Sequence, residues 1–399
     1  MSPGAMAPAT PTPLDRRLAG ALERLRAADL YRLRRVVDGG HGAHLRVDGR
    51  DCLNFCSNDY LGLAADPRVA AAARAALADG TGSGAAALVS GYNREHQALE
   101  EELAAFLQRP RALLFSTGWA ANLGVLRGLL GRGDRLLADE LNHASLIDGG
   151  RLSGAEYCRI AHADPAAYAQ ALAQPCAGLS LIATDSVFSM DGDLAPLQAL
   201  ERLRRGGGAA LMVDDAHGFG VLGEGGRGCL FEPEGAGVAP EIYVATLGKS
   251  LGAAGAFVAG SQELVEYLVQ KARSWVFSTA PPPALAAAAR AALRIVQAEP
   301  ERRAQLHANL ARFRAGCAQL GIPVAASRTP IQPLLLGDAA RSLALSRRLL
   351  ERGYWVAAIR PPTVPEGTSR LRITLSAAHR PAEIDGLLAA LAEAWRELP

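Results

Sequence analysis

Lysine is nearly absent from this sequence, which leaves few amines for chemistry. Of its 42 Lys plus Arg residues, only Lys249 and Lys271 are lysines. Lys271 follows the segment 263–269, whose mixture of apolar and acidic residues predicts a surface helix with this amine in solvent. Lys249 is therefore the stronger candidate for any reaction that needs an amine nucleophile.

Other absences exclude whole classes of protein. The formal net charge is only +2, so no basic excess indicates a nucleic-acid or membrane-surface partner. The six cysteines form no C-x-x-C pair and lie near no histidines at zinc-finger spacing, so reduced thiols are expected and no metal. The first 13 residues lack the pattern of a secretory signal, and no apolar run has the length of a membrane span. A cytoplasmic protein with small, near-neutral partners is expected.

What the sequence does contain is an alternation of short apolar runs with helical patterns from about residue 60 to 285. The runs predict strands at 112–115, 135–138, 180–184, 210–213, 242–245 and 256–259. Helices lie between several of them, for example at 119–130 and 194–205. This alternation predicts an α/β fold with a large, doubly wound and mainly parallel sheet.

Smaller patterns flank this region. An amphipathic helix is predicted at 14–37, and one or two short strands at 47–55. After the prolines at 281–283 a long helical stretch begins, followed by strands at 332–336, 354–359 and 371–375 and helices at 339–352 and 381–397. We expect an N-terminal arm (1–55) that packs with a smaller C-terminal α+β domain (286–399), and a large domain (56–285) between them.

Polar residues gather where the predicted strands end, which is where ligands bind in open α/β sheets. Asp214 and His217 follow one strand and Lys249 follows another. The segment 185–189 follows a third strand, and the segment 116–119 joins a fourth to its helix.

The segment 213–217 places an acidic pair and a histidine directly after an apolar strand. The Asp214 carboxylate could hold a protonated pyridine nitrogen, while His217 bonds a phenolic oxygen of the same ring. A metal site is an alternative, because Asp and His are also metal ligands. A helix cap beside a satisfied histidine is a third interpretation.

The segment 246–250 offers the amine of Lys249 just past another strand. Burial beside cationic groups lowers the pKa of a lysine and prepares it for imine chemistry, and the Thr246 hydroxyl could bond a phosphate. Gly-Lys-Ser also ends a nucleotide phosphate loop, as in a nucleotide hydrolase. That loop needs a glycine at the position of Tyr243, so the spacing argues against it.

Two further segments could contact a bound cofactor. Gly118 and Trp119 begin a predicted helix, whose N–H groups and dipole favour a phosphate. His143 could stack on a cofactor ring, although a lone histidine is often structural. The segment 218–223 matches a dinucleotide-binding fingerprint, but the glycine-rich residues behind it cannot open the required helix.

Together these segments resemble the α-oxoamine synthases, a family of fold-type I pyridoxal-phosphate (PLP) enzymes. The matching pieces are 57–62, 142–145, 187–192, 214–218 and 248–249. The resemblance implies a homodimeric enzyme that carries PLP on its large domain, with active sites at the subunit interface.

The resemblance also implies a role for each matching residue. Lys249, His143, Asp214 and His217 would be catalytic, with Lys249 carrying PLP as a Schiff base and removing the α-proton. The implied cofactor contacts are Asp214 to the pyridinium, His143 to the ring face, Ser189 and His217 to the phenolic oxygen, and Gly118, Trp119 and Thr246 to the phosphate, with Ser278 and Thr279 reaching the phosphate from the neighbouring chain. The implied substrate contacts are Arg360 and Asn58 to a carboxylate, and Arg32 and Thr363.

The segment 354–365, supported by 331–333, indicates which reaction within the family is expected. It resembles the member that condenses L-alanine with a pimeloyl thioester, with loss of CO2, on the route to biotin. The carrier of the pimeloyl group is either coenzyme A or acyl carrier protein. A glycine C-acetyltransferase-type enzyme of the same family is the main alternative, and a nucleotide hydrolase is an alternative of another class.

Overall fold

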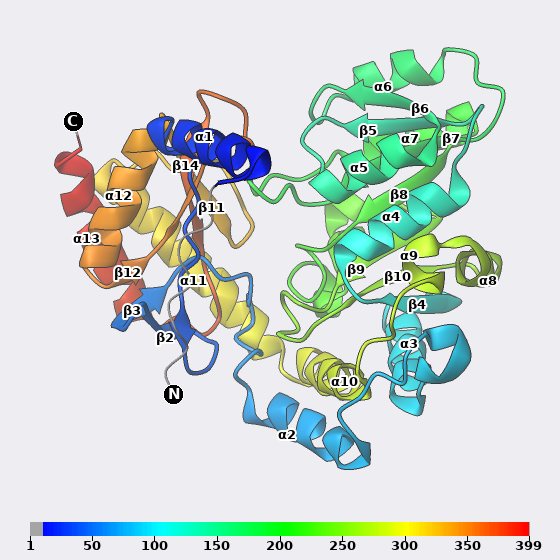
Figure 1. Cartoon of the computed structure of the whole chain (residues 1–399), viewed down its shortest axis with the longest axis horizontal. Coiled ribbons are helices and arrows are strands. Elements are labelled where there is room, and N and C mark those ends of the chain that lie inside the picture. The colour runs from blue at the N-terminus through cyan, green and yellow to red at the C-terminus, as the bar shows by residue number, and fades with distance from the viewer. Residues whose placement is uncertain (1–10, 399) are drawn as a thin grey trace.

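A seven-stranded sheet forms the centre of the larger part of the molecule (Figure 1). This computed structural model describes residues 11–398. Most of the segment 1–13, for which no secretory signal is predicted, lies outside the described residues. The strand order is β4-β10-β9-β8-β7-β5-β6, and only β10 runs antiparallel to its neighbours. The strands are β4 (Arg111–Phe115), β5 (Arg135–Asp139), β6 (Glu156–Ile160), β7 (Ser180–Asp185), β8 (Ala210–Asp214), β9 (Ile242–Thr246) and β10 (Ala256–Gly260).

The prediction of a mainly parallel α/β sheet is confirmed. Six of these strands begin and end within one residue of the predicted positions. The sequence analysis missed β6, because this edge strand carries Glu156 and Arg159 and is only partly buried.

Alternate residues of the strands pack into two separate cores, as expected for a sheet covered on both faces. On β8, Leu211 and Val213 belong to one core and Met212 to the other. The first core includes α3 (Arg94–Phe106), α6 (Pro165–Leu172), α7 (Leu197–Gly207) and α10 (Pro283–Ala298). The second includes α4 (Gly118–Leu129), α5 (Ala144–Ser153) and α8 (Gln262–Lys271), and α9 (Arg273–Val276) packs beside α4 and α8. The sheet is therefore doubly wound.

The remaining elements build the smaller part of the molecule, where α1 and α13, the first and last helices of the described residues, both lie (Figure 1). One sheet has the order β11-β14-β13 and another β1-β2-β3-β12. The strands are β1 (Val37–Asp38), β2 (His44–Val47), β3 (Arg50–Asn54), β11 (Ile331–Gly337), β12 (Tyr354–Trp355), β13 (Ala357–Ile359) and β14 (Ser369–Thr374). The helices are α1 (Pro13–Ala27), α11 (Pro300–Leu320), α12 (Ala339–Glu351) and α13 (Pro381–Arg396), while α2 (Pro67–Ala76) packs on α10.

Three predicted elements are corrected. The helix predicted at 14–37 ends at Ala27, because the chain turns out of the helix at Asp29, whose φ is +56°. The strand predicted at 354–359 is divided at Val356 into β12 and β13, which belong to different sheets. The long helix after the prolines is two helices, α10 and α11, separated at Glu299.

The three-part division of the chain stays a prediction. Tyr354 of β12 pairs with Leu53 of β3, which joins the N-terminal arm to the C-terminal part as expected. However, α10 packs on α2 and α3, although most of it falls in the predicted 286–399 unit. Among residues 11–398, no helix is long and apolar enough to cross a membrane.

Candidate active site

The carboxyl ends of β7, β8 and β9 bring together the charged residues that the sequence singled out. Asp185 ends β7 and pairs in register with Asp214, which ends β8. β9 leads through Thr246 to Lys249. Lys249 Nζ lies 2.8 Å from Nε2 of His217, which follows β8. The site therefore forms where parallel strands end, as the sheet topology predicts.

Asp214 is buried and accepts two hydrogen bonds. Its Oδ2 accepts from Asn122 Nδ2 at 2.7 Å, and its Oδ1 accepts from the backbone N–H of Ala216 at 3.0 Å. Asn122 Nδ2 also donates to Ser145 Oγ at 2.8 Å, which lies 2.7 Å from His143 Nδ1. The carboxylate and the exposed His143 ring are thus linked through two uncharged side chains.

Asn122 was not predicted as a site residue. It is an amide at a fully buried position of α4, a helix that is mostly apolar apart from Asn122 and Arg127. That isolated polar residue four positions after Gly118 was the available signal, because a buried amide needs hydrogen-bond partners.

Asp185 places a second buried carboxyl beside Asp214. It accepts from the backbone N–H of His143 at 2.7 Å, and the Asn142 side chain holds its own backbone N–H at 2.9 Å. Burial and the neighbouring charge of Asp214 hold the pKa of Asp185 well above its ordinary value. The shift favours the neutral form of the Asp185 carboxyl.

Lys249 lies in surroundings that favour the neutral amine. Burial lowers the pKa of Lys249 to about 8, although Asp214 and Asp185 oppose this shift. Burial and the positive charge of Lys249 hold the pKa of His217 well below its ordinary value. A neutral imidazole thus faces an amine that is partly uncharged near neutral pH.

His217 is also held from behind, by residues to which the sequence analysis gave no role. Its Nδ1 lies 2.6 Å from the hydroxyl of Tyr60. Asn58 Oδ1 accepts from Arg372 Nη1 at 3.0 Å, and Arg372 Nε donates to the backbone oxygen of Ser189 at 2.6 Å. Arg372 therefore connects two predicted site residues from β14, a strand whose sequence carried no sign of a site.

The predicted phosphate contacts begin α4. Thr117 caps this helix and accepts from Ala120 N at 3.0 Å. The N–H groups of the first helical turn have no partner within the helix, and nothing lies within 4 Å of the place where a Cβ on Gly118 would stand. Trp119 packs edge-on to His143, with 6.2 Å between the ring centroids. Thr246 Oγ1 donates to Gly255 O at 3.0 Å and therefore also fixes the loop that carries Lys249.

Five predicted residues lie in two other groups, three in the first and two in the second. Arg32 Nη2 donates to Thr363 Oγ1 at 3.1 Å, and Arg360 donates to the backbone oxygens of Asp29 and Tyr31. Arg360 Nε is buried without a hydrogen-bond partner among the described residues, which leaves a cationic donor for an anion. In this chain, none of the hydrogen bonds among residues 11–398 joins these arginines to Lys249.

Ser278 and Thr279 form the other group. Thr279 bridges to Ala86, and Ser278 Oγ lies 3.5 Å from the backbone oxygen of Thr279. The structure does not bring them into hydrogen-bond contact with Lys249 or Thr246 of the same chain. This is compatible with the expectation that they serve a neighbouring chain, which stays a prediction.

The donor set around Lys249 fits PLP. An amine of lowered pKa suits the aldehyde, a buried carboxylate suits the pyridinium, and open helix N–H groups suit the phosphate. Among the described residues no group of three or more His, Cys, Asp or Glu is arranged to hold a metal ion.

Comparisons with known proteins agree with this chemistry. The model of the aminotransferase class I and II family matches residues 50–391. An 8-amino-7-oxononanoate synthase from Methylococcus capsulatus is 58% identical over 379 residues, which cover 94% of this chain and 97% of that protein. Many further 8-amino-7-oxononanoate synthases are similar at 50–56% identity.

Solved structures share the fold. A serine palmitoyltransferase variant from S. paucimobilis with a bound PLP-myriocin aldimine is 28% identical, with a TM-score of 0.90, over 95% of this chain and 97% of that one. An 8-amino-7-oxononanoate synthase from Francisella tularensis is 30% identical, with a TM-score of 0.75, over 86% of this chain and 98% of that one.

The fold and the site thus define an enzyme of the class I and II aminotransferase type, with pyridoxal phosphate as its cofactor. Within that class the chain belongs to the 8-amino-7-oxononanoate synthases. The predicted resemblance to the α-oxoamine synthases and the predicted PLP cofactor are confirmed.

Proposed function

We propose that this protein condenses L-alanine with a pimeloyl thioester to give 8-amino-7-oxononanoate, CO2 and the free thiol, in the synthesis of biotin. The observation that carries the proposal is that Lys249, 2.8 Å from His217, and the buried Asp214 carboxylate lie at neighbouring strand ends in a chain 58% identical to such a synthase. The reaction is balanced without an oxidant, because the new carbon–carbon bond replaces the carboxylate of alanine and the thioester loses its thiol.

We propose that the cofactor is held through four sets of contacts. Asp214 pairs with the ring nitrogen, His143 covers the ring face, His217 and Ser189 bond the phenolic oxygen, and Gly118, Trp119 and Thr246 hold the phosphate. PLP held by these contacts would withdraw electrons from the α-carbon of an amino acid that has replaced Lys249 on the cofactor, and would leave the Lys249 amine free to act as a base.

The protein side chains supply orientation and proton transfer. Because the pKa of Lys249 is lowered to about 8, a fraction of its amine is uncharged near neutral pH and can take the α-proton of alanine. Arg360 and Asn58 bind the alanine carboxylate, and the unpartnered Nε of Arg360 supports this role. Arg32 and Thr363 contact the acyl donor.

We further propose that the chain works as a homodimer in the cytoplasm. Val89 of the turn η2 (Ala87–Gly91) is 83% exposed, and Phe277, which follows α9, is 72% exposed. Exposed apolar side chains that gather in this way mark interaction surfaces. The turn η2 and the helix α9 contact each other beside Ser278 and Thr279. A second copy of the chain bound at this surface would therefore receive Ser278 and Thr279 at its own site.

The assay that tests the function uses purified enzyme loaded with PLP. L-alanine with pimeloyl-CoA or pimeloyl-acyl carrier protein should give 8-amino-7-oxononanoate, detected by mass spectrometry. Comparison of the two donors identifies the carrier. Product from glycine and acetyl-CoA at a higher rate would contradict the proposal and support the glycine C-acetyltransferase alternative. The mass in solution, measured by light scattering, tests the dimer.

A further inference from the structure

A chain of hydrogen bonds runs from Tyr60 through His217 to Lys249. The contacts proposed above for the cofactor and the substrate give Tyr60 no role. The Tyr60 hydroxyl lies 2.6 Å from His217 Nδ1, and His217 Nε2 lies 2.8 Å from Lys249 Nζ. Tyr60 is fully buried, so this hydroxyl depends on protein partners. A phenol is thereby connected to the amine of Lys249 through a single imidazole.

The distances indicate which way the protons point. Hydroxyl donors form bonds of 2.5–3.0 Å, whereas N–H donors to oxygen are usually near 2.9–3.0 Å, so roughly 2.6 Å fits a bond that the Tyr60 hydroxyl donates. The other oxygen within reach of Tyr60 is Asn58 Oδ1 at 3.2 Å, which also accepts from Arg372 Nη1 at 3.0 Å. The shorter of the two distances favours a Tyr60 proton on the His217 side.

We propose that the Tyr60 hydroxyl sets the tautomer of His217, holding its proton on Nε2, so that this nitrogen donates to the Lys249 amine. A neutral imidazole carries one proton, and an Nδ1 that accepts from Tyr60 leaves that proton on Nε2. Lysine Nζ can accept this bond only as the free amine. Tyr60 is thus a positioning residue that favours neutral Lys249, and the inference rests on the proposed role of Lys249 as the cofactor-carrying amine.

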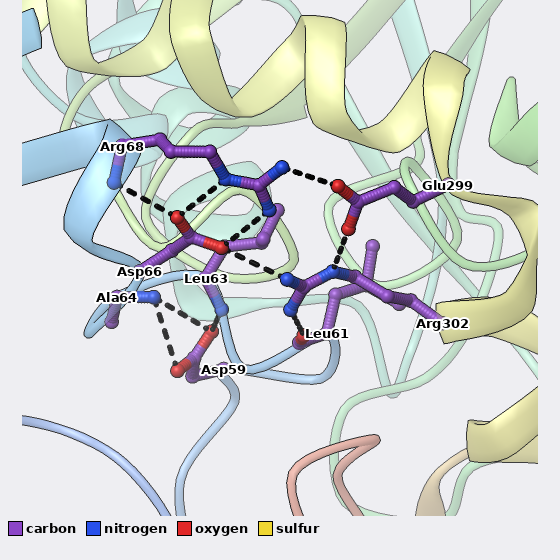
Figure 2. A network of polar contacts seen from close by, with 8 residues as sticks. All are labelled: Asp59, Leu61, Leu63, Ala64, Asp66, Arg68, Glu299 and Arg302. Carbon is purple, nitrogen blue, oxygen red and sulfur yellow. Dashed lines mark hydrogen bonds and ion pairs between the residues drawn. The ribbon is translucent and has the colours of Figure 1, made fainter.

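The loop around Tyr60 is held in place by a polar network, which Figure 2 shows. On one side of Tyr60, the Asp59 carboxylate accepts from the backbone N–H of Ala64 at 3.2 Å. On the other side, Arg302 Nη1 donates to the backbone oxygen of Leu61 at 3.2 Å. The backbone on both sides of Tyr60 is therefore held by contacts that do not involve His217.

The loop of Lys249 packs directly on the same segment. A Cβ on Gly252, whose φ is +61°, would stand 2.1 Å from the backbone nitrogen of Ala64. Gly252 N in turn donates to Lys249 O at 2.9 Å. Only glycine permits this approach, which keeps the distance between Tyr60 and Lys249 short.

The charged groups around this chain of hydrogen bonds act on both Lys249 and His217. Asp214, Asp185 and Asp215 raise the pKa of Lys249, while burial and Arg372 lower it. Burial is the largest cause that lowers the pKa of His217, and Lys249, Arg372 and His143 each lower this pKa further. All of these causes disfavour the charged form of His217. The property that Tyr60 sets is therefore the tautomer of the neutral imidazole, and not its charge.

The test measures the pKa of Lys249 in the full chain without cofactor. Selective ¹³Cε-lysine labelling gives two side-chain signals, because the sequence has only two lysines. Lys249→Ala identifies the signals, and the exposed Lys271 serves as a reference in the same spectrum. Tyr60→Phe should raise the pKa of Lys249 by about 0.5–1 unit, the equivalent of one ordinary hydrogen bond.

Two further variants separate this effect from a general loss of structure. Tyr168→Phe removes another fully buried hydroxyl, one without a hydrogen-bond partner among residues 11–398, and should leave the pKa of Lys249 within about 0.2 unit. In a His217→Gln background, Tyr60→Phe should have no further effect, because it acts through the imidazole. The proposal is overturned if the pKa of Lys249 does not rise in Tyr60→Phe, or if it rises equally in Tyr168→Phe. It is also overturned if Tyr60→Phe still raises the pKa of Lys249 in the His217→Gln background.

This result is separable from the proposed function. Failure to condense alanine with a pimeloyl thioester would overturn the function and leave the titration unaffected. A normal turnover with an unchanged Lys249 pKa in Tyr60→Phe would overturn the role of Tyr60 alone.

Discussion

The elbow between α10 and α11 and the carboxyl ends of β7–β9 both carry charged side chains, but their charges are paired differently. At the elbow, formed by Asp66, Arg68, Glu299 and Arg302, each carboxylate meets two guanidinium groups (Figure 2). At the strand ends, Lys249 meets a neutral imidazole, and the carboxyl groups are bonded by backbone and amide N–H groups.

The pKa shifts of the two regions run in opposite directions. Hydrogen bonds from Arg68 lower the pKa values of Asp66 and Glu299 to about 2, which stabilises their charged forms. Burial instead lowers the pKa of Lys249 to about 8 and raises that of Asp185, which favours their neutral forms. The elbow thus supports the fold, whereas the strand ends retain groups that can change protonation during a reaction.

The largest effect is expected from removing the amine. Lys249→Ala should lose the visible absorption band of Schiff-base-bound PLP and all measurable turnover, because the other lysine lies on the surface. Lys271→Ala is the matched control and should keep both. Turnover by Lys249→Ala would show that the strand ends do not hold the essential amine.

The next largest effect is expected at the buried carboxylate. Asp214→Asn leaves a bound pyridinium without its counter-charge, which costs about 3–5 kcal/mol, or roughly 10²-fold to 4 × 10³-fold in cofactor affinity or rate. Fluorescence titration with PLP and steady-state kinetics measure the two. Asp385→Asn, in an exposed pair with Arg312, should change neither. A loss below tenfold at Asp214 would mean that its charge is not used.

The pH dependence of cofactor capture follows from the lowered pKa of Lys249. Only the neutral amine attacks the PLP aldehyde, so the capture rate of the cofactor-free protein should rise about tenfold per pH unit and level off near pH 8. Stopped-flow absorbance from pH 6 to 9.5 measures this. A rate still rising at pH 9.5 would show that the amine has an ordinary pKa near 10.4.

The smallest effect is expected at the elbow. The folded pKa of Asp66 lies near 2, below its unfolded value near 3.9, so its stabilisation is complete above about pH 4 and is lost as the pH falls toward 2. Asp66→Asn should lower the unfolding free energy by about 1 kcal/mol at pH 7, and by less below pH 4. Thermal unfolding across this range measures the difference, and a gap that widens on acidification would contradict the pairing.

Residues that follow apolar strands could be predicted, because the topology of a parallel sheet fixes where strand ends meet. The placement of Asp214, His217 and Lys249 just past neighbouring strands was predicted in this way. Asn122, Tyr60 and Arg372 were not assigned roles, because their roles depend on contacts between distant segments, such as Asn58 with Arg372. Pairings of this kind, like the division of 354–359 between two sheets, are set by tertiary packing and leave no local pattern.

The central claim is that Lys249 carries the cofactor, and chemical trapping tests it most directly. The PLP-loaded enzyme is reduced with borohydride, digested and mapped by mass spectrometry. The account predicts a pyridoxyl group on the peptide that contains Lys249, in about one copy per chain, and none on Lys271. A label on Lys271, or PLP released intact after reduction, would contradict it.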